Sequence, residues 1–119
     1  MEYEENEMIK KINEIMSRYL WMDFELTSAS TGKVVLHGFL DESGEDKIQI
    51  VFSDVDAILC KTSFTFEGEK EFLKELDGEK ACAINLNYSI LQGMKIFQIL
   101  NTDIEGEMYI IAKNVDYIV

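Results

Sequence analysis

The chain has 119 residues, of which 23 are acidic and 11 basic, and its formal net charge is −12. This charge disfavours nucleic acids and anionic membranes as partners and favours a basic protein surface. A hydrophobic content of 47% excludes a disordered acidic tail, and the length predicts one domain over residues 1–119.

Features of the sequence that report on compartment favour a cytoplasmic protein. The first residues are acidic and contain no apolar run, so no secretion signal is expected. No stretch approaches the ~18 apolar residues of a membrane span. Cys60 and Cys82 lack CxxC spacing, and we expect two reduced core residues rather than a disulfide.

The first twenty residues have the pattern of an amphipathic helix. Its apolar stripe, at three-four spacing, consists of Met8, Ile9, Ile12, Ile15, Met16, Tyr19 and Leu20. We expect this stripe to pack on the sheet of the same domain, because that is the usual role of such a face.

From Trp21 onward the hydrophobic period changes to two. The pattern predicts strands at 22–28, 33–40, 47–52 and 55–62, a helix over 69–76, and strands at 81–88, 94–100, 107–112 and 115–118. The short connections favour antiparallel neighbours. The predicted class is α+β: an N-terminal helix packed on a curved, mainly antiparallel sheet of about seven or eight strands, with a short second helix.

Two segments 60 residues apart resemble each other. Residues 48–59 align with 108–119, with identities at Ile50/Ile110, Val55/Val115, Asp56/Asp116 and Ile58/Ile118. The match suggests an internal duplication with units 1–60 and 61–119, although two unrelated antiparallel meanders can share this pattern. In either case, the sequence Asp/Asn-Val-Asp-x-Ile predicts a bend or bulge that directs the chain into another strand.

Residues 50–59 resemble the first motif of haloacid dehalogenase-like phosphatases, an apolar strand followed by Asp54-Val55-Asp56. That chemistry needs a sharp turn after the second acid, usually supplied by Gly-Thr. Ala57-Ile58 follows here, so we interpret the acids as a turn.

Residues 101–106 resemble the first half of an EF-hand loop, with oxygen-bearing side chains at Asn101, Asp103 and Glu105 before Gly106. The twelfth position is Ala112 instead of a bidentate glutamate, and strands flank the loop, so we expect no dedicated calcium site.

The single histidine, His37, alternates with Val35 and Phe39 on one strand face. We expect a hydrogen-bonded structural residue, because sequence places no catalytic partner beside it.

Phosphate-binding, dinucleotide-binding and serine-hydrolase motifs are absent from the chain. The sequence therefore predicts a protein that is not an enzyme, with no cofactor and no metal ion.

Most acids lie in four clusters: the start of the first helix, the surroundings of the second predicted helix, and two turns. The turn residues are Asp41, Glu42, Glu45 and Asp46, and Asp103, Glu105 and Glu107. If the turns correspond through the internal repeat, they should emerge at related ends of the sheet. They are predicted to form an acidic rim that binds a basic partner, and general solubility is the alternative explanation.

Residues 50–58 and 109–118, two strands that carry aromatic and acidic residues, resemble small bacterial immunity proteins of toxin–immunity loci. The resemblance implies a compact acidic protein that blocks a basic toxin domain, commonly a nuclease.

Two other functions stay open. One is a homo-oligomeric scaffold that uses exposed strand ends at Tyr109 and Tyr117, and the other is a small-molecule binder with a pocket in the curved sheet near His37, Cys60 and Cys82.

Overall fold

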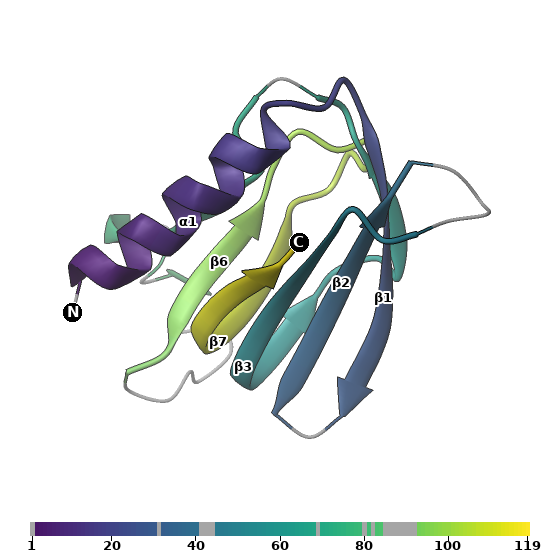
Figure 1. Ribbon diagram of the computed structural model, residues 1–119. Helices are drawn as coiled ribbons and strands as arrows, with labels where there is room; N and C mark the ends of the chain where they lie inside the picture. Colours follow the sequence, from purple (N-terminus) through teal and green to yellow (C-terminus); the bar gives the residue numbers. More distant parts are fainter. Residues whose placement is uncertain are drawn as a thin grey trace.

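The computed structural model describes residues 2–30, 32–40, 45–68, 70–79, 81, 83–84 and 93–119. The elements, drawn in Figure 1, are α1 (Glu2–Met16), β1 (Met22–Ser30), β2 (Lys33–Phe39), β3 (Ile48–Leu59), β4 (Ser63–Phe66), β5 (Leu73–Glu75), β6 (Lys95–Ile99) and β7 (Met108–Ile118). The predicted α+β class, with an N-terminal helix and an antiparallel sheet, is confirmed.

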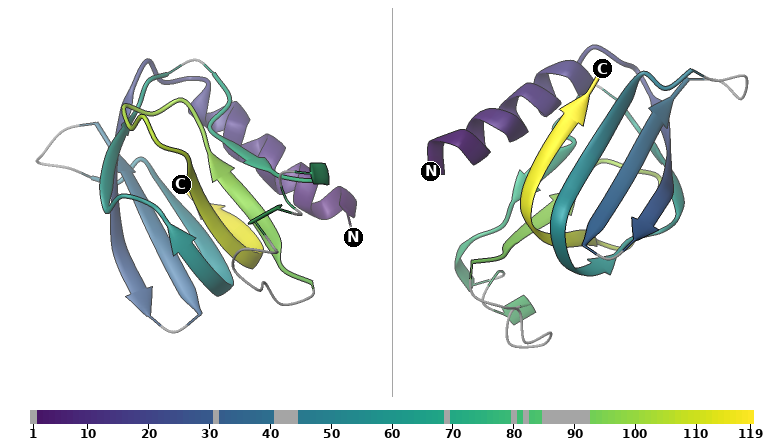
Figure 2. Two further views of the ribbon diagram at one scale, coloured as in Figure 1. Left: turned by 180° about the vertical axis from the view of Figure 1, so that it is seen from behind. Right: turned by 60° about the horizontal axis from the view of Figure 1, so that its bottom comes forward.

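The strands form one seven-stranded sheet in the order β4-β1-β2-β3-β7-β6-β5. Each pair of neighbours is antiparallel. The sheet curls into a half-barrel, and α1 lies along one side of it next to β7 and β5 (Figure 1, Figure 2). Among the described residues, no helix combines the length and the apolarity needed to cross a membrane.

The central strand β3 bends at the Asp54-Val55-Asp56 sequence. Asp54 has a φ of 54°, and the β3–β7 register shifts between Val55 and Ala57. A bulge of this kind strengthens the local twist and bends the strand. The predicted bend is therefore confirmed at this point, although the same strand continues beyond it.

The core fills the concave side of the sheet and is rich in phenylalanine. The fully buried rings are Phe24, Phe52, Phe66, Phe72 and Phe97. The ring centroids of Phe24 and Phe72 are 4.7 Å apart, and those of Phe66 and Phe72 are 5.2 Å apart. Such offset and edge contacts add ~0.5–1.5 kcal/mol each to the stabilisation from burial.

The apolar stripe of α1 packs against this core. Ile9, Ile12 and Met16 are buried, as predicted. Leu20, which the predicted stripe included, follows the helix and is 71% exposed. Tyr19 still packs against the core, so Leu20 alone departs from the predicted stripe.

Asn13 attaches α1 to the start of β5. Its Oδ1 accepts hydrogen bonds from the backbone N–H groups of Phe72 and Leu73, at 2.9 and 3.0 Å, and its Nδ2 donates to the Leu73 carbonyl at 2.8 Å. β5 is the last strand of the sheet order, so one amide side chain satisfies backbone groups that a sheet edge would leave unpaired.

The helix predicted over 69–76 is wrong. Residues 73–75 form β5, which pairs with β6. Phe72 and Leu73 belong to the main core, whereas Leu76 packs in a second cluster. Their spacing fits a helix face, but backbone pairing with β6 and with Asn13 overrides the local preference.

The strand predicted over 81–88 is also wrong where it can be compared. Ala81, Ala83 and Ile84 have helical backbone conformation. The other positions of this prediction, 82 and 85–88, lie outside the described residues.

Two pairs of predicted strands are each one continuous strand. The ranges 47–52 and 55–62 together become β3, which ends at Leu59, and the ranges 107–112 and 115–118 become β7. The sheet still has seven strands, within the predicted number, because β4 and β5, which the sequence pattern did not predict, are added to it.

The two segments of the internal repeat form β3 and β7, which pair with each other; Ile50 lies opposite Tyr117 and Leu59 opposite Tyr109. β2 and β6 flank this central pair. In the first unit, 1–60, α1 and β1 precede β2. In the second unit, 61–119, the strands β4 and β5 precede β6, which is the strand that would correspond to β2. The structure therefore does not show the helix-plus-meander duplication.

Candidate functional site

The outer face of β2, β1 and β4 carries side chains in cross-strand rows. In the first row, Phe39 lies opposite Asp23, and Asp23 lies opposite Thr65. The next residues, Phe24 and Phe64, are buried in the core. Because side chains alternate across a strand, the first row points away from the core.

A second row on the same face lies two residues away along each strand. His37 pairs with Glu25, and Glu25 pairs with Ser63. Gln49 of β3 extends this row on the other side of His37. The two rows make an outer face with aromatic, acidic and hydroxyl side chains.

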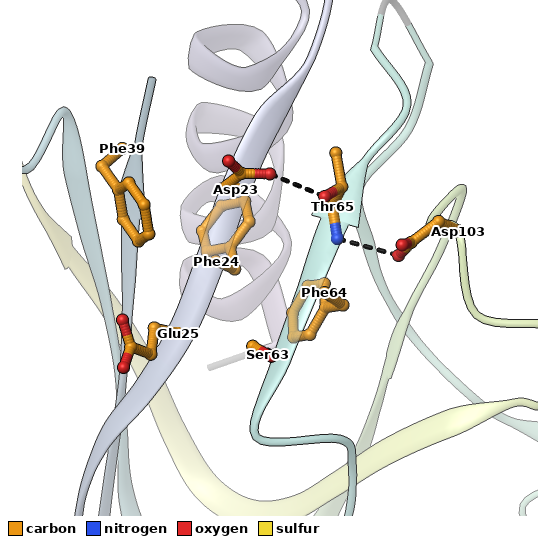
Figure 3. A pocket seen from close by; sticks show the side chains of 8 residues that line it. All are labelled: Asp23, Phe24, Glu25, Phe39, Ser63, Phe64, Thr65 and Asp103. Carbon is orange, nitrogen blue, oxygen red and sulfur yellow. Dashed lines mark hydrogen bonds between the residues drawn. The ribbon is translucent and has the colours of Figure 1, made fainter. Parts of the chain in front are cut away.

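Thr65 holds one carboxylate on each of its two sides. Its hydroxyl donates a 2.6 Å hydrogen bond to Asp23 Oδ1, and its backbone N–H donates a 2.8 Å hydrogen bond to Asp103 Oδ1 (Figure 3). The backbone N–H of Asp103 in turn donates to the Thr65 carbonyl at 3.0 Å. Asp103, from the connection between β6 and β7, is therefore fixed on the side of Thr65 opposite to Asp23 of β1.

The same connection covers the free edge of β4. Thr102 forms an isolated antiparallel bridge with Phe66, and the N–H of Glu67 donates to the Asn101 carbonyl at 2.8 Å. β4 is the first strand of the sheet order. These contacts pair an edge that would otherwise be exposed, and they position Asp103.

Asp46 reaches the outer face from the connection between β2 and β3. Its Oδ2 lies 2.5 Å from His37 Nδ1 and 3.4 Å from Gln49 Nε2. His37 is thus a hydrogen-bonded strand residue that shares a face with Phe39, and both expectations are confirmed.

An open groove of about 480 Å³ crosses this outer face. Its lining residues are Asp23, Phe24, Glu25, Phe39, Ser63, Phe64, Thr65 and Asp103 (Figure 3). Three of these residues are acidic and none is basic, so the groove is formally anionic. A cation would find both charge complementarity and an aromatic wall there.

Comparison of the chain with protein-family models, with curated proteins and with solved structures finds no match. The site is therefore interpreted from its own geometry and charge.

The structure places four of the seven predicted rim residues near this face or in the connections that border it. Asp46 and Asp103 contact strand residues on its two sides. Glu45 precedes Asp46 and is exposed, and Glu105 is exposed in the same connection as Asp103. Asp41 and Glu42 lie outside the described residues.

The two turns do not emerge at the same end of the central strand pair. Antiparallel pairing places Gln49, at the start of β3, opposite Ile118, at the end of β7. The turn before β3 and the turn before β7 therefore lie at opposite ends of the pair. Asp103 approaches the outer face only because its connection packs on β4.

Glu107 lies outside the groove. Its Oε2 accepts hydrogen bonds from Gln98 Nε2, at 3.2 Å, and from the hydroxyl of Tyr109. Tyr109 is only 8% exposed and packs in the second apolar cluster, while Tyr117 packs against the main core. The expectation of an exposed strand end is therefore wrong for Tyr109, while Tyr117 is partly exposed.

The loop that resembles an EF-hand uses its side chains for other contacts. Asn101 Nδ2 donates to the Glu71 carbonyl at 2.6 Å, and Asp103 accepts from Thr65. In the part of the chain that the structure describes, no group of three or more His, Cys, Asp or Glu residues could hold a metal ion.

Cys60 packs against the main core, and its thiol donates to the Lys61 carbonyl at 3.1 Å. Burial raises the pKa of this thiol to about 11. At neutral pH the thiol keeps its proton, and a protonated thiol is a poor nucleophile. The position fits the predicted core residue, and Cys82 lies outside the described residues.

Sequence reasoning missed Asp23, Glu25, Phe39 and Thr65 as site residues. Asp23 and Glu25 alternate with buried Phe24, which was a signal for a polar outer face on β1. Thr65 could not be found, because β4 was not predicted, although its residues also alternate between polar and aromatic.

Proposed function

We propose that the protein is a non-enzymatic binding module that recognises a basic protein through the outer face of β2, β1 and β4. The observation that carries this proposal is the convergence of carboxylates from β1 and from the β6–β7 connection on one groove that no basic residue lines. Asp46 adds a further acid beside the second row. Complementary charge raises association rates and selects against acidic partners.

The proposed role is that of an immunity-type or antitoxin-like inhibitor. The carboxylates compete with phosphate groups for the basic surface of a partner, which blocks a partner that acts on nucleic acid. This role suits a rigid acidic face, and the hydrogen bonds from Thr65 hold two of its carboxylates in place before binding.

The geometry favours this role over a small-molecule pocket inside the sheet. Buried side chains such as Ile50, Phe52 and Phe97 fill the concave side. His37, which that hypothesis placed beside the pocket, points to the outer face.

A homo-oligomeric scaffold is the second candidate, because large apolar side chains are exposed. Val119 is 78% exposed, Ile118 57% and Trp21 44%. Light scattering tests this alternative: a monomer at all concentrations would exclude it.

Paired charge reversals test the proposed face. The purified protein serves as bait in an extract of its host, in its native form and as Glu25→Lys/Glu45→Lys. Both residues are exposed, and within the described part of the chain neither side chain forms a hydrogen bond or an ion pair. We expect the native bait to retain a basic protein that elutes as salt rises, and the variant to lose it.

The matched control is Glu7→Lys/Glu79→Lys, which changes the net charge equally at two exposed residues outside the groove. It should retain the same protein as the native bait. The proposal is wrong if no basic protein is retained, if both variants lose the partner equally, or if neither loses it. Titration calorimetry with the purified partner then measures the affinity of each variant.

A further inference from the structure

Phe39 lines the groove but does not belong to the apolar core of the described residues. The residue is half-buried on the outer face. Its ring lines the groove together with Asp23, Glu25 and Asp103 (Figure 3). An aromatic wall in an anionic groove has the chemistry that attracts organic cations, independently of the carboxylates.

The carboxylates keep free acceptor sites. Asp23 and Asp103 each use Oδ1 for Thr65. Within the described part of the chain, the second oxygen of each carboxylate and both oxygens of Glu25 accept no hydrogen bond. Three acids with open lone pairs around one groove repel each other, and a bound cation relieves that repulsion.

The groove does not suit a metal ion, since no group of three metal-binding side chains converges among the described residues. A guanidinium group suits it better. It is planar, carries five N–H donors in a fixed fork, and stacks on aromatic rings while it bonds carboxylates. A lysine ammonium group has three donors around one point and stacks less well.

We propose that this groove is the seat for an arginine side chain of the protein partner, with the guanidinium stacked on Phe39 and hydrogen-bonded to Asp23 and Glu25. Asp103, on the far side of Thr65, adds negative charge at the other end of the groove. This assignment rests on the proposed function and specifies the residue type that the partner presents. Arginine anchors of this kind often dominate the energy of an interface when they are central and desolvated.

The test uses two defined probes, acetyl-arginine methylamide and acetyl-lysine methylamide, added to the isotope-labelled full chain at low salt. Amide chemical shifts of Thr65 and Asp103 report binding, because both residues line the groove. We expect saturable shifts with the arginine probe and roughly 3- to 5-fold weaker binding of the lysine probe, which also controls for ionic strength.

Two conservative variants separate the ring from the charge. Phe39→Leu keeps the formal charge and should reduce the arginine affinity to the level of lysine. Glu25→Gln should weaken both probes, whereas Glu7→Gln, on α1, should change neither. Equal affinity for the two probes, no binding, or an arginine preference that survives Phe39→Leu would overturn the assignment.

The outcomes also separate this inference from the proposed function. If a basic protein is captured through the outer face but the probes show no arginine preference, only the arginine seat is wrong. If the arginine probe binds in the groove and no basic protein is captured, the seat stands and the proposed protein-binding role is wrong.

Discussion

The side chain of Asn13 bonds both backbone polar groups of Leu73, a residue far along the chain at the start of β5. Oδ1 accepts from the N–H and Nδ2 donates to the carbonyl, so the amide imitates one rung of a sheet ladder. Leu73 itself is fully buried in the main core. This contact therefore connects the helix, the sheet edge and the core at one point.

Replacing Asn13 with alanine should destabilise the protein by about 2–3 kcal/mol, because two backbone N–H groups and one carbonyl lose their partner. Asn13→Asp keeps the acceptor and should cost less. Urea unfolding, read as the transition midpoint, measures both. Ser17→Ala is the control, since that hydroxyl bonds the Glu14 carbonyl at the exposed helix end. If Asn13→Ala loses no more stability than Ser17→Ala, the expectation is wrong.

Gly38→Ala should destabilise the protein by about 1–3 kcal/mol through overpacking. A Cβ atom at this position would lie 2.5 Å from Met22 Sδ and 2.9 Å from both Ile48 Cγ2 and Phe24 Cε1. Thermal unfolding followed by circular dichroism measures the effect. Gly106→Ala is the matched control, because nothing lies within 4 Å of its added Cβ and its φ is not positive. Equal melting temperatures for the two variants would show that the β2 packing is looser than described.

The bulge in β3 depends on the left-handed backbone of Asp54, which has a φ of 54°. Asp54→Gly should preserve stability or raise it slightly, while Asp54→Val should lower it by about 1–2 kcal/mol, because β-branched residues resist this conformation. Chemical unfolding ranks the two variants. Asp56→Val, at an exposed position with negative φ in the same strand, should change little. If valine is tolerated equally at both positions, the conformation at 54 is not the cause.

The raised pKa of Cys60, about 11, predicts both slow alkylation and a pH-dependent loss of stability. In a Cys82→Ser background at pH 8, iodoacetamide should modify the folded thiol roughly 10-fold more slowly than the thiol in urea, because fewer thiolates form. The folded thiol keeps its proton above pH 9, where the unfolded thiol begins to lose it, so stability should fall as pH rises between about 9 and 11.

Cys60→Ala should remove that part of the pH dependence, and unfolding curves at several pH values test it. If the free energy of unfolding falls equally steeply above pH 9 in the native protein and in Cys60→Ala, other titrating groups cause the pH dependence. Rapid alkylation of the folded protein at pH 8 would instead show that the thiol is not desolvated.

The strands predicted from alternation were found where one face is buried and the other exposed. In β3, buried Ile48, Ile50 and Phe52 alternate with half-exposed residues, so the sequence pattern follows the two faces directly. The helical stripe at Ile9, Ile12 and Met16 succeeded for the same reason. In both elements the local period coincides with the burial that the fold imposes.

The failures occurred where partners distant in sequence decide the conformation. β5 depends on Asn13 and β6, and no local signal in residues 73–75 distinguishes a short edge strand from a helix turn. The candidate groove has the same origin. Asp23, Thr65 and Asp103 meet only because the β6–β7 connection packs on β4, a tertiary contact that charge counting along the chain cannot predict.

The antiparallel β3–β7 pair also has a consequence for the order in which the protein folds. Gln49 must find Ile118, and Leu59 must find Tyr109, so the centre of the sheet forms only after a long loop has closed. Loop closure of this length slows folding, typically to milliseconds or seconds. During synthesis, the meander of β1, β2 and β3 leaves the ribosome with one edge of β3 unpaired, and that edge stays open to other chains until β7 arrives.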